Sequence, residues 1–479
     1  MRFLDAAPQY DLTYSDVFLA PSRSGIASRL DVDLTPRDGT PATLPIVSAN
    51  MNSVTGPRLA ASLARRGGLG ILPQDMPLQS LDEALHWVKS QPVGFDTAVQ
   101  LPASASVAQA RGRVPAQVGY GIVVTDADGE IIGAIPAERL EHAVADAPLS
   151  DFLGEKLASV DLEELHSARR AFDLMVAADL HFAPVVHQGT VVGSISRRGA
   201  LRSTIYDPAL DAEGRLAVGA AIGINGDVAQ KARAIAQAGA DVIVVDTAHG
   251  HQEGAIRAIA TVKSLGLGLP IVAGNVVTAE GVKDLVEAGA TIIKVGVGPG
   301  AMCTTRMMTA VGRPQFSAVL ETSAAARELG AHVWADGGVR YPRDVALALA
   351  AGAASVMIGS WFAGTVEAPG DIAIDAHGRA YKESWGMASA RAVNERFRRL
   401  DAYELARKQL FAEGISSSTI YLDPLRPSVE DLLDMITSGV RSSMTYAGAH
   451  DLAEFHERAV VGIQSDAGYE EGKALPVSW

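Results

Sequence analysis

The amino-acid sequence predicts an α/β fold, a closed (β/α)8 TIM barrel interrupted by one inserted module. Short apolar runs alternate with alanine-rich stretches of helical period, the pattern of parallel strands covered by helices. Three helical stretches also end alike, at Ala238-Gly239, Ala288-Gly289 and Ala351-Gly352, and an apolar run follows each glycine at once. A glycine that caps a helix directly before a strand is typical of repeated βα units.

Eight apolar runs are the expected barrel strands, because strands buried on both faces are apolar along their whole length. They are residues 46–49, 68–72, 216–222, 241–246, 271–275, 291–296, 333–336 and 355–359. Helical periods lie between them, for example over 227–239, 253–265, 278–289 and 343–351. No dinucleotide-binding glycine fingerprint opens the series, which favours a barrel over the alternative, an open doubly wound sheet.

The interval between the second and third runs is far too long for one helix. Within it, Ile122–Ile135 resembles Pro184–Ile195, and each reads as a strand, a tight glycine turn, a strand and the start of a helix. We therefore expect residues 1–92 and 207–479 to form the barrel and residues 93–206 to form an inserted pair of α/β modules. The alternative is a structural insertion without ligands, since the two units carry no sharp binding residues.

Composition describes a globular protein of the cytoplasm. Hydrophobic residues make up 48% of the 479 residues and charged residues 20%. The formal net charge is -14 and no long basic run exists, so we expect no nucleic-acid surface. The N-terminus shows no signal-peptide core, no apolar stretch is long enough to span a bilayer, and a single cysteine suits a reducing compartment.

That cysteine, Cys303, lies in a glycine-rich loop directly after the sixth expected strand. The loop reads Gly-Val-Gly-Pro-Gly-Ala-Met-Cys-Thr-Thr-Arg over residues 296–306. Three glycines and a proline give the loop a defined shape, and barrel chemistry occurs at this end of the strands. Cys303 is the expected nucleophile; the alternative is a buried cysteine that acts as a small hydrophobic residue.

Other polar residues follow neighbouring strands at the same end of the barrel. Asp246–His251 follows the fourth strand, Gly274-Asn275 the fifth, Asp336–Gly338 the seventh and Gly359-Ser360 the eighth. Glycines after the last two strands occupy the usual phosphate-binding position of barrels, where bare N–H groups can approach an anion. The placement predicts a phosphorylated small molecule as ligand.

Two features near this end have open interpretations. His249 and His251 indicate a metal only weakly, because no third ligand has suitable spacing, so loop capping or a cofactor contact is expected instead. Asp246 could bind ribose hydroxyls or cap the next helix. The region from Trp361 to about Tyr421, with the basic stretch Arg391–Arg399, is too large for an ordinary loop and reads as a lid or as a subunit contact.

With these residues in place, the sequence resembles the inosine monophosphate dehydrogenase / guanosine monophosphate reductase family over essentially its whole length. The matching stretches are Leu12–Pro21, Asp246–Gly250, Gly298–Arg306, Ala335–Arg340 and Gly359–Gly364. The insertion resembles a tandem cystathionine-β-synthase-type (CBS, or Bateman) regulatory module, which in this family binds purine nucleotides.

The resemblance implies roles for individual residues. Cys303 would attack purine C2, with Thr305 and Glu413 managing proton transfer. The implied substrate contacts are Met51, Asp336, Gly338, Gly359, Ser360, Met387 and Ala388. The implied cofactor contacts are Asp246, Thr247, Ala248 and Asn275. The carbonyl groups of Gly298, Gly300 and Cys303 form the expected site of a monovalent cation such as K+.

The sequence departs from the family pattern at two positions near the expected phosphate site. Ala301 stands where the family usually has a phosphate-binding serine, and Ser384 stands where a tyrosine often helps. Phosphate binding is therefore expected to depend on Gly338, Gly359 and Ser360.

Local features favour the reductase branch of the family, which expels ammonia from GMP and uses NADPH. Thr309, Pro314–Val319 and Ala49–Met51 are similar to reductases, and Phe397–Asp401 lacks the arginine-tyrosine pair that dehydrogenases use for hydrolysis. The insertion and the Asp246–His251 loop are closer to dehydrogenases. The alternatives are therefore NAD-dependent oxidation of IMP to XMP, or a nucleotide-binding protein without catalysis.

The resemblance also implies partners. We expect GMP and IMP as substrate and product, ATP and GTP as effectors of the insertion, and homotetramers that pair into octamers.

Overall fold

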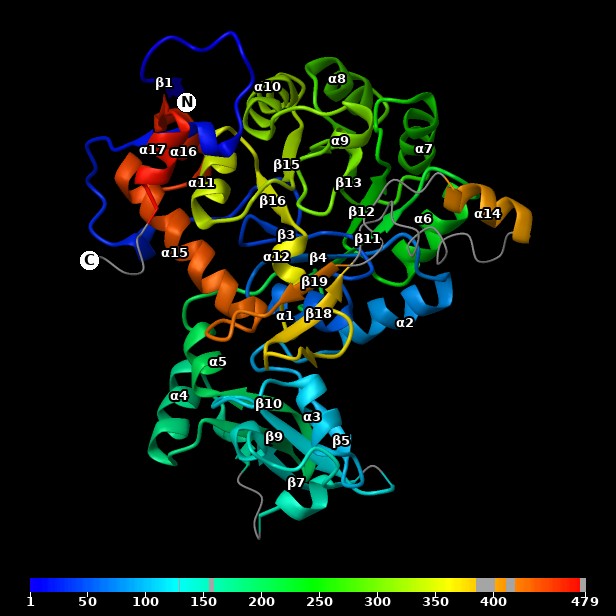
Figure 1. Cartoon of the computed structure of the whole chain (residues 1–479), viewed down its shortest axis with the longest axis vertical. Coiled ribbons are helices and arrows are strands. Elements are labelled where there is room, and N and C mark those ends of the chain that lie inside the picture. Colours follow the sequence, from blue (N-terminus) through cyan, green and yellow to red (C-terminus); the bar gives the residue numbers. More distant parts are fainter. Residues whose placement is uncertain (129, 155–158, 385–400, 411–417, 474–479) are drawn as a thin grey trace.

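The structure is a computed structural model that describes residues 1–128, 130–154, 159–384, 401–410 and 418–473. Eight parallel strands close into a barrel in the order β11-β12-β13-β14-β15-β16-β3-β4 (Figure 1). They are β3 (Ile46–Ser48), β4 (Leu69–Leu72), β11 (Val218–Ile222), β12 (Val242–Asp246), β13 (Ile271–Val276), β14 (Ile292–Val295), β15 (His332–Asp336) and β16 (Ser355–Ile358). All eight expected runs are confirmed as barrel strands, with bounds that shift by at most two residues, and the open sheet is excluded.

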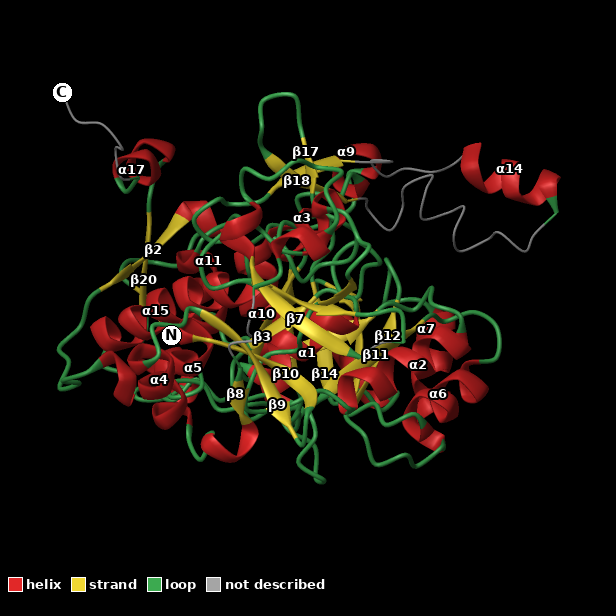
Figure 2. Cartoon of the chain, turned by 90° about the horizontal axis from the view of Figure 1, so that it is seen from below, coloured by secondary structure: helices red, strands yellow, loops and turns green. Residues whose placement is uncertain are grey.

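Helices surround the barrel, as Figure 2 shows from below. Those that alternate with the strands are α1 (Pro57–Arg65), α2 (Leu78–Lys89), α6 (Val228–Gln237), α7 (Glu253–Ser264), α8 (Ala279–Glu287), α10 (Gln315–Glu328), α11 (Pro342–Ala350) and α15 (Val429–Ala447). The helices expected over 227–239, 253–265, 278–289 and 343–351 are confirmed as α6, α7, α8 and α11. Short helices on the rim are α9 (Thr305–Thr309) and α12 (Ser360–Ala363).

A small sheet beside the barrel joins segments from near the two ends of the chain. The N-terminal strands β1 (Arg2–Phe3) and β2 (Val17–Ala20) pair with β20 (Val460–Ile463) near the other end of the sequence, in the order β1-β20-β2. Helices α16 (Leu452–Arg458) and α17 (Asp466–Glu471) flank β20 in sequence.

The inserted segment forms two small three-stranded sheets that lie below the barrel in Figure 1. The first has β5 (Gln100–Pro102), α3 (Val107–Arg113), β6 (Gly121–Thr125) and β7 (Ile131–Pro136). The second has β8 (Val160–Asp161), α4 (Ala168–Ala177), β9 (Phe182–His187) and β10 (Thr190–Ser196), followed by α5 (Arg197–Arg202). Each sheet has its own apolar core. The repeated hairpins β6-β7 and β9-β10 are as expected, but each repeat also begins with a short strand and a helix that the sequence did not reveal.

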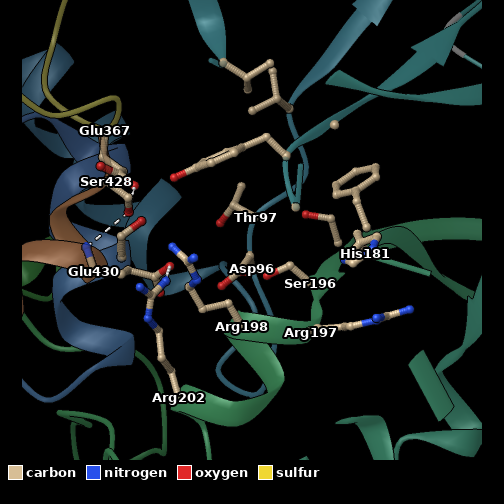
Figure 3. Close-up of a pocket in the computed structure, with 18 of the residues that line it drawn as sticks. Asp96, Thr97, His181, Ser196, Arg197, Arg198, Arg202, Glu367, Ser428 and Glu430 are labelled. Atoms are coloured by element: carbon tan, nitrogen blue, oxygen red, sulfur yellow. Dashed lines mark hydrogen bonds and ion pairs between the residues drawn. The ribbon is translucent and has the colours of Figure 1, made fainter. Parts of the chain in front are cut away.

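Buried ion pairs join the insertion to the barrel. Directly after α1, the C-cap residue Arg66 donates to Asp96 (3.1 Å), where the chain enters the insertion, and to Ser203 Oγ (2.8 Å), where it leaves. Arg66 also contacts Glu430 of α15 at 2.6 Å. Arg202 of α5 approaches the second Glu430 oxygen at 3.2 Å, and these two residues are labelled in Figure 3. Because buried charges are costly unless paired, this network fixes where the two parts meet.

Low pH should loosen this junction through Glu430. Burial raises the pKa of this carboxyl, but Arg66 and Arg202 outweigh burial and lower the pKa to about 2. A carboxyl whose folded-state pKa is depressed stabilises the fold above its ordinary pKa and loses that contribution as pH falls through the folded value. We expect a loss on the order of 3 kcal/mol at most between about pH 4.5 and 2.

The measurement is urea unfolding followed across this pH range for the native chain and for Glu430→Gln. The variant should be less stable at pH 6 and should show a flatter pH dependence. Glu328→Gln, which changes an exposed carboxylate on α10, is the matched control. Equal pH dependence in the native chain and Glu430→Gln would contradict the assignment.

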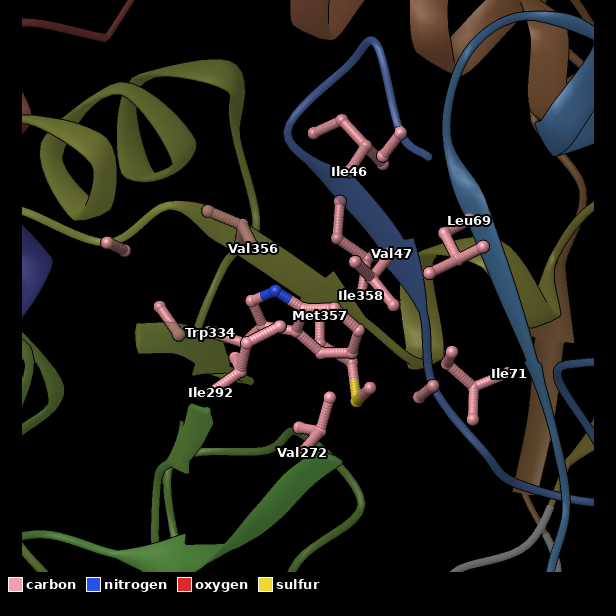
Figure 4. Packing of buried hydrophobic residues seen from close by; sticks show 14 of the residues in the cluster. Ile46, Val47, Leu69, Ile71, Val272, Ile292, Trp334, Val356, Met357 and Ile358 are labelled. Carbon is pink, nitrogen blue, oxygen red and sulfur yellow. The ribbon is translucent and has the colours of Figure 1, made fainter. Parts of the chain in front are cut away.

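Side chains from strands all around the barrel fill its interior. Trp334 of β15 is fully buried and packs near Ile292, Val356 and Met357 (Figure 4). Its indole N–H donates to Asp38 Oδ2 at 2.7 Å, which gives this buried carboxylate a hydrogen-bond partner. The packed interior leaves the carboxyl ends of the strands as the place for a ligand.

Candidate functional site

A cavity of about 340 Å3 opens at the carboxyl ends of the barrel strands, the face on which barrel enzymes place their active sites. Residues that follow seven of the strands line it. They are Asn50 and Met51, Gln74, Asp246–Ala248, Asn275, Gly296–Thr305, Asp336–Arg340 and Gly359–Trp361. The four sequence stretches expected at this end of the barrel are therefore brought together with the cysteine loop.

The floor of the cavity is a charged network centred on Lys294 of β14. Its buried Nζ lies 2.9 Å from Asp246 Oδ1 and 2.5 Å from Asp336 Oδ2. Asn50 donates to the other Asp246 oxygen at 2.9 Å, and Asn275 donates to Asp336 Oδ2 at 2.9 Å. The network holds two carboxylates that line the cavity against one ammonium group, so each carboxylate has a defined orientation.

The two carboxylates also keep the Lys294 amine protonated. Burial alone would lower the pKa of this amine, but Asp246 and Asp336 outweigh burial and raise its pKa above the usual range. Lys294 is therefore a fixed cation at neutral pH and cannot serve there as a base.

Sequence reasoning missed Lys294 and Asn50 as structural parts of the site. The signal for Lys294 was present, because a lysine inside the apolar run Ile292–Val295 must be buried, and a buried lysine needs carboxylate partners. For Asp246 we expected either a ribose contact or a helix cap. The structure shows that its carboxylate contacts Lys294 and Asn50 instead of capping α7, whose N-cap is Gln252.

The cysteine loop crosses the cavity mouth. Cys303 is exposed, so the alternative of a buried structural cysteine is excluded. Its backbone N–H donates to the Gly300 carbonyl at 3.0 Å, and Thr305 begins α9 two residues later. Gly298 has φ +83°, and a Cβ there would lie 2.7 Å from Arg306 Cβ, so the loop requires glycine at this position.

Glycines also shape the side of the cavity where a phosphate is expected. Gly337 and Gly338 have φ of +85° and +82°, and a Cβ on Gly338 would lie 3.2 Å from Pro299 of the cysteine loop. A Cβ on Gly359 would lie 3.5 Å from Met51 Sδ, which places two expected substrate contacts side by side. Ser360 begins α12 on the same rim. Ser384 does not line this cavity; it is buried, and its Oγ lies 3.0 Å from Ser53 Oγ.

The side formed by β12 and β13 has unused hydrogen-bonding capacity. Thr247 and Asn275 are joined through their backbones, since Asn275 N–H donates to Thr247 O at 3.0 Å. The Asn275 side-chain N–H group donates to Gly296 O at 2.7 Å and to Asp336, but its buried Oδ1 accepts no hydrogen bond from the described residues. A ligand that donates an N–H or O–H fits this atom, as the expected cofactor contact requires.

The nearby histidines are not arranged for metal binding. His251 Nε2 lies 2.7 Å from Asp284 of α8, and His249 is exposed. Within the part of the chain that the structure describes, no group of three His, Cys, Asp or Glu residues could hold a metal ion. The expected monovalent-cation site uses carbonyl groups instead, and one of them, Gly300 O, already accepts the Cys303 N–H.

Several expected residues lie outside the described part of the chain. They are Glu413, Met387, Ala388, the basic stretch Arg391–Arg399 and most of Phe397–Asp401. The described strands on either side, β18 (Ala380–Ser384) and β19 (Ser418–Tyr421), pair with each other, and β17 (Ala373–Ile374) completes their sheet. Between them, α14 (Ala402–Leu410) is the described helix. The described residues directly before and after this part of the chain therefore lie side by side in one sheet.

A second cavity, of about 240 Å3, lies in the cleft between the insertion and the barrel (Figure 3). Its lining combines arginines, hydroxyl groups and aromatic rings, among them Arg58, Arg197, Arg198, Arg202, Thr97, Ser194, Ser196, Tyr120 and Phe182. Glu367 accepts a hydrogen bond from Ser428 at 2.6 Å on the barrel side. The two repeated units of the insertion showed few binding residues in sequence, because the residues that line this cavity come from segments far apart along the chain.

The chain has known relatives over its full length. Residues 11–474 match the IMP dehydrogenase / GMP reductase domain. The sequence is 54% identical to the GMP reductase of Mycobacterium tuberculosis (strain ATCC 25618 / H37Rv) over 487 aligned residues, which cover 100% of both chains. It is 36% identical to the inosine-5'-monophosphate dehydrogenase of Aquifex aeolicus (strain VF5), covering 96% of this chain and 94% of the relative.

Solved structures agree with the sequence matches. A GMP reductase from Trypanosoma brucei in complex with guanosine 5'-monophosphate matches with a TM-score of 0.69 and 29% identity, covering 99% of each chain. No helix in the described residues is both long and apolar enough to cross a membrane.

Proposed function

Since this chain belongs to the IMP dehydrogenase / GMP reductase family, we propose that it is a GMP reductase, an oxidoreductase that converts GMP to IMP and ammonia with NADPH. The observation that carries this direction is the full-length identity to the mycobacterial GMP reductases, which exceeds the identity to the IMP dehydrogenases. The exposed Cys303 at the mouth of the barrel cavity supports covalent chemistry on a purine.

The proposed reaction begins with attack of the Cys303 thiolate on C2 of GMP. A C–S bond forms, and the bond from C2 to the amino nitrogen breaks as ammonia leaves with one added proton. Thr305 and Glu413 would deliver that proton. NADPH, when bound, supplies the hydride that replaces the amino group at C2. The C–S bond then breaks, its electron pair returns to sulfur, and IMP leaves.

We assign the reactants to different walls of the cavity. Gly338, Gly359 and Ser360 would bind the phosphate, and Asp336 would hold the ribose hydroxyls in the orientation that Lys294 and Asn275 fix. Met51, Met387 and Ala388 would contact the base. The cofactor would lie along Asp246, Thr247, Ala248 and Asn275, and a monovalent cation such as K+ could bind the carbonyls of the cysteine loop.

One absorbance assay distinguishes this proposal from IMP dehydrogenase. With GMP and NADPH, the nicotinamide absorbance should fall and ammonia should appear. With IMP and NAD, absorbance should stay constant. Rapid NAD reduction with IMP would favour the dehydrogenase instead.

We further propose that the insertion is a CBS regulatory module and that ATP and GTP bind in the cleft of Figure 3. Arginines, hydroxyls and aromatic rings are the groups that hold phosphates, ribose and a purine ring. The protein would act in the cytoplasm as homotetramers that pair into octamers, and light scattering with and without nucleotide tests that assembly.

The effector proposal predicts a loss of nucleotide binding when Arg198 is changed. Arg198→Ala should weaken ATP or GTP binding by about tenfold, because one charge-assisted hydrogen bond to phosphate is lost. Calorimetric titration of the full chain measures this. Arg169→Ala removes the same charge from the outer face of α4 and should leave binding unchanged. Equal affinity in the Arg198 variant and the native chain would place the nucleotides elsewhere.

A further inference from the structure

Gln74 is a polar residue of the barrel cavity that the family resemblance and the proposed mechanism do not use. It follows β4 after Pro73 and lines the same cavity as Cys303 and Thr305. Its Oε1 is buried and accepts no hydrogen bond from the described residues. A buried acceptor without a hydrogen-bond donor destabilises the fold by about 1–3 kcal/mol. We therefore expect a bound ligand to donate a hydrogen bond to this atom.

No described residue beside Gln74 donates a hydrogen bond to its Oε1. A Cβ on Gly223, directly after β11, would lie 2.8 Å from Oε1, so the amide rests against a glycine of the neighbouring strand. The other polar side chains of the cavity floor, Asp246, Lys294 and Asp336, already bond to one another. Gln74 is therefore free to meet a ligand at no cost to that network.

The barrel order places Gln74 across the cavity from the cysteine loop. β4 and β14 are four places apart in either direction around the closed barrel. A purine bound covalently to Cys303 lies toward β14, and the ring that delivers hydride to C2 must stack on it. The space between the purine and β4 is where such a ring fits.

On this basis we propose that Gln74 contacts the carboxamide of the nicotinamide ring, with Oε1 accepting one of the carboxamide N–H bonds. The inference rests on the proposed GMP reductase function. Because a primary amide carries both a donor and an acceptor, it pairs with the Gln74 side chain in either orientation of its amide, whereas the purine amino group offers only donors. Gln74 thereby positions the ring without touching the reacting carbon.

The test combines a change in the protein with a change in the cofactor. NADPH and its reduced 3-acetylpyridine analogue, which lacks the carboxamide N–H, are titrated calorimetrically into the native chain and into Gln74→Met. The native chain should bind NADPH roughly tenfold more tightly than the analogue, and the variant should bind both within about twofold. Gln74→Glu, which keeps an acceptor oxygen, should retain the preference for NADPH.

Two controls separate this contact from other effects. Gln79→Met changes an exposed glutamine on α2, whose amide bonds only to Glu83 in the described structure, and should bind like the native chain. The KM for GMP should stay within about twofold in Gln74→Met. A raised KM for GMP with an intact cofactor preference would assign Gln74 to the purine amino group and overturn the proposal.

The outcomes also distinguish this inference from the proposed function. If the native chain does not oxidise NADPH with GMP, the function itself is wrong. If it does, and Gln74→Met still prefers NADPH to the analogue as strongly as the native chain, only the Gln74 contact is wrong.

Discussion

Cys303→Ala is expected to lower kcat for GMP reduction by about 10^4-fold or more, because no C–S bond can form without the thiol. GMP binding should persist, since the phosphate and ribose contacts come from glycines, Ser360 and Asp336 on other strands. Stopped-flow NADPH oxidation and calorimetric titration of GMP measure the two effects separately. Substantial turnover in the variant would exclude covalent catalysis by this residue.

The single cysteine provides an independent check of the same step. Cys303 is the single cysteine of the sequence, so thiol-selective alkylation with iodoacetamide should add one mass, which mass spectrometry locates without further variants. Inactivation should follow the extent of labelling, and saturating GMP should slow both equally. Labelling that leaves activity intact would contradict the proposed role.

Lys294→Met is expected to reduce kcat/KM by about 10^2-fold or more and to destabilise the fold by about 3–5 kcal/mol. The change leaves Asp246 and Asp336 as two half-buried carboxylates without their shared cation, so one must take up a proton or move. Both the ribose contact and the cofactor contact would then lose their orientation. Steady-state kinetics for each substrate and thermal unfolding measure these losses.

Two further lysine variants make the Lys294 result specific. Lys294→Arg retains the positive charge and should recover part of the stability. Lys283→Met removes an exposed lysine of α8 whose carboxylate partner lies 3.8 Å away, and should change stability by no more than about 0.5 kcal/mol. Similar effects from Lys283→Met and Lys294→Met would show that the buried network has no special role.

The barrel was predictable because burial on both faces requires a continuous run of apolar residues in each strand, and such runs are visible in the sequence. A strand such as Val242–Asp246 is buried from Val242 to Val245 and must be apolar there, so its position can be read from the sequence to within two residues. The position of Cys303 and Asp336 at one rim followed from the same logic, because parallel strands end at the same edge of the sheet.

The contacts within the site were less accessible to sequence reasoning. Lys294 contacts Asp246 and Asp336 only because three separate strands close into a ring, and no local pattern records such a pairing. Gln74 was not among the predicted site residues, because no sequence pattern marks a single glutamine after a strand as a binding residue. Its place in the cavity is known only from the structure. The cleft beside Arg198 depends on how the insertion docks, which is a property of the tertiary structure.

The contacts of Arg66 have a consequence for how such a chain could arise and vary. One side chain touches Asp96, where the inserted segment begins, and Ser203, where it ends, so both crossings of the boundary occupy almost the same point. A segment with adjacent ends can be gained, exchanged or lost as a cassette without breaking any strand of its host. The barrel and the inserted segment could thus have separate evolutionary histories, with Arg66 at the end of α1 retained as the contact for both ends of each inserted segment.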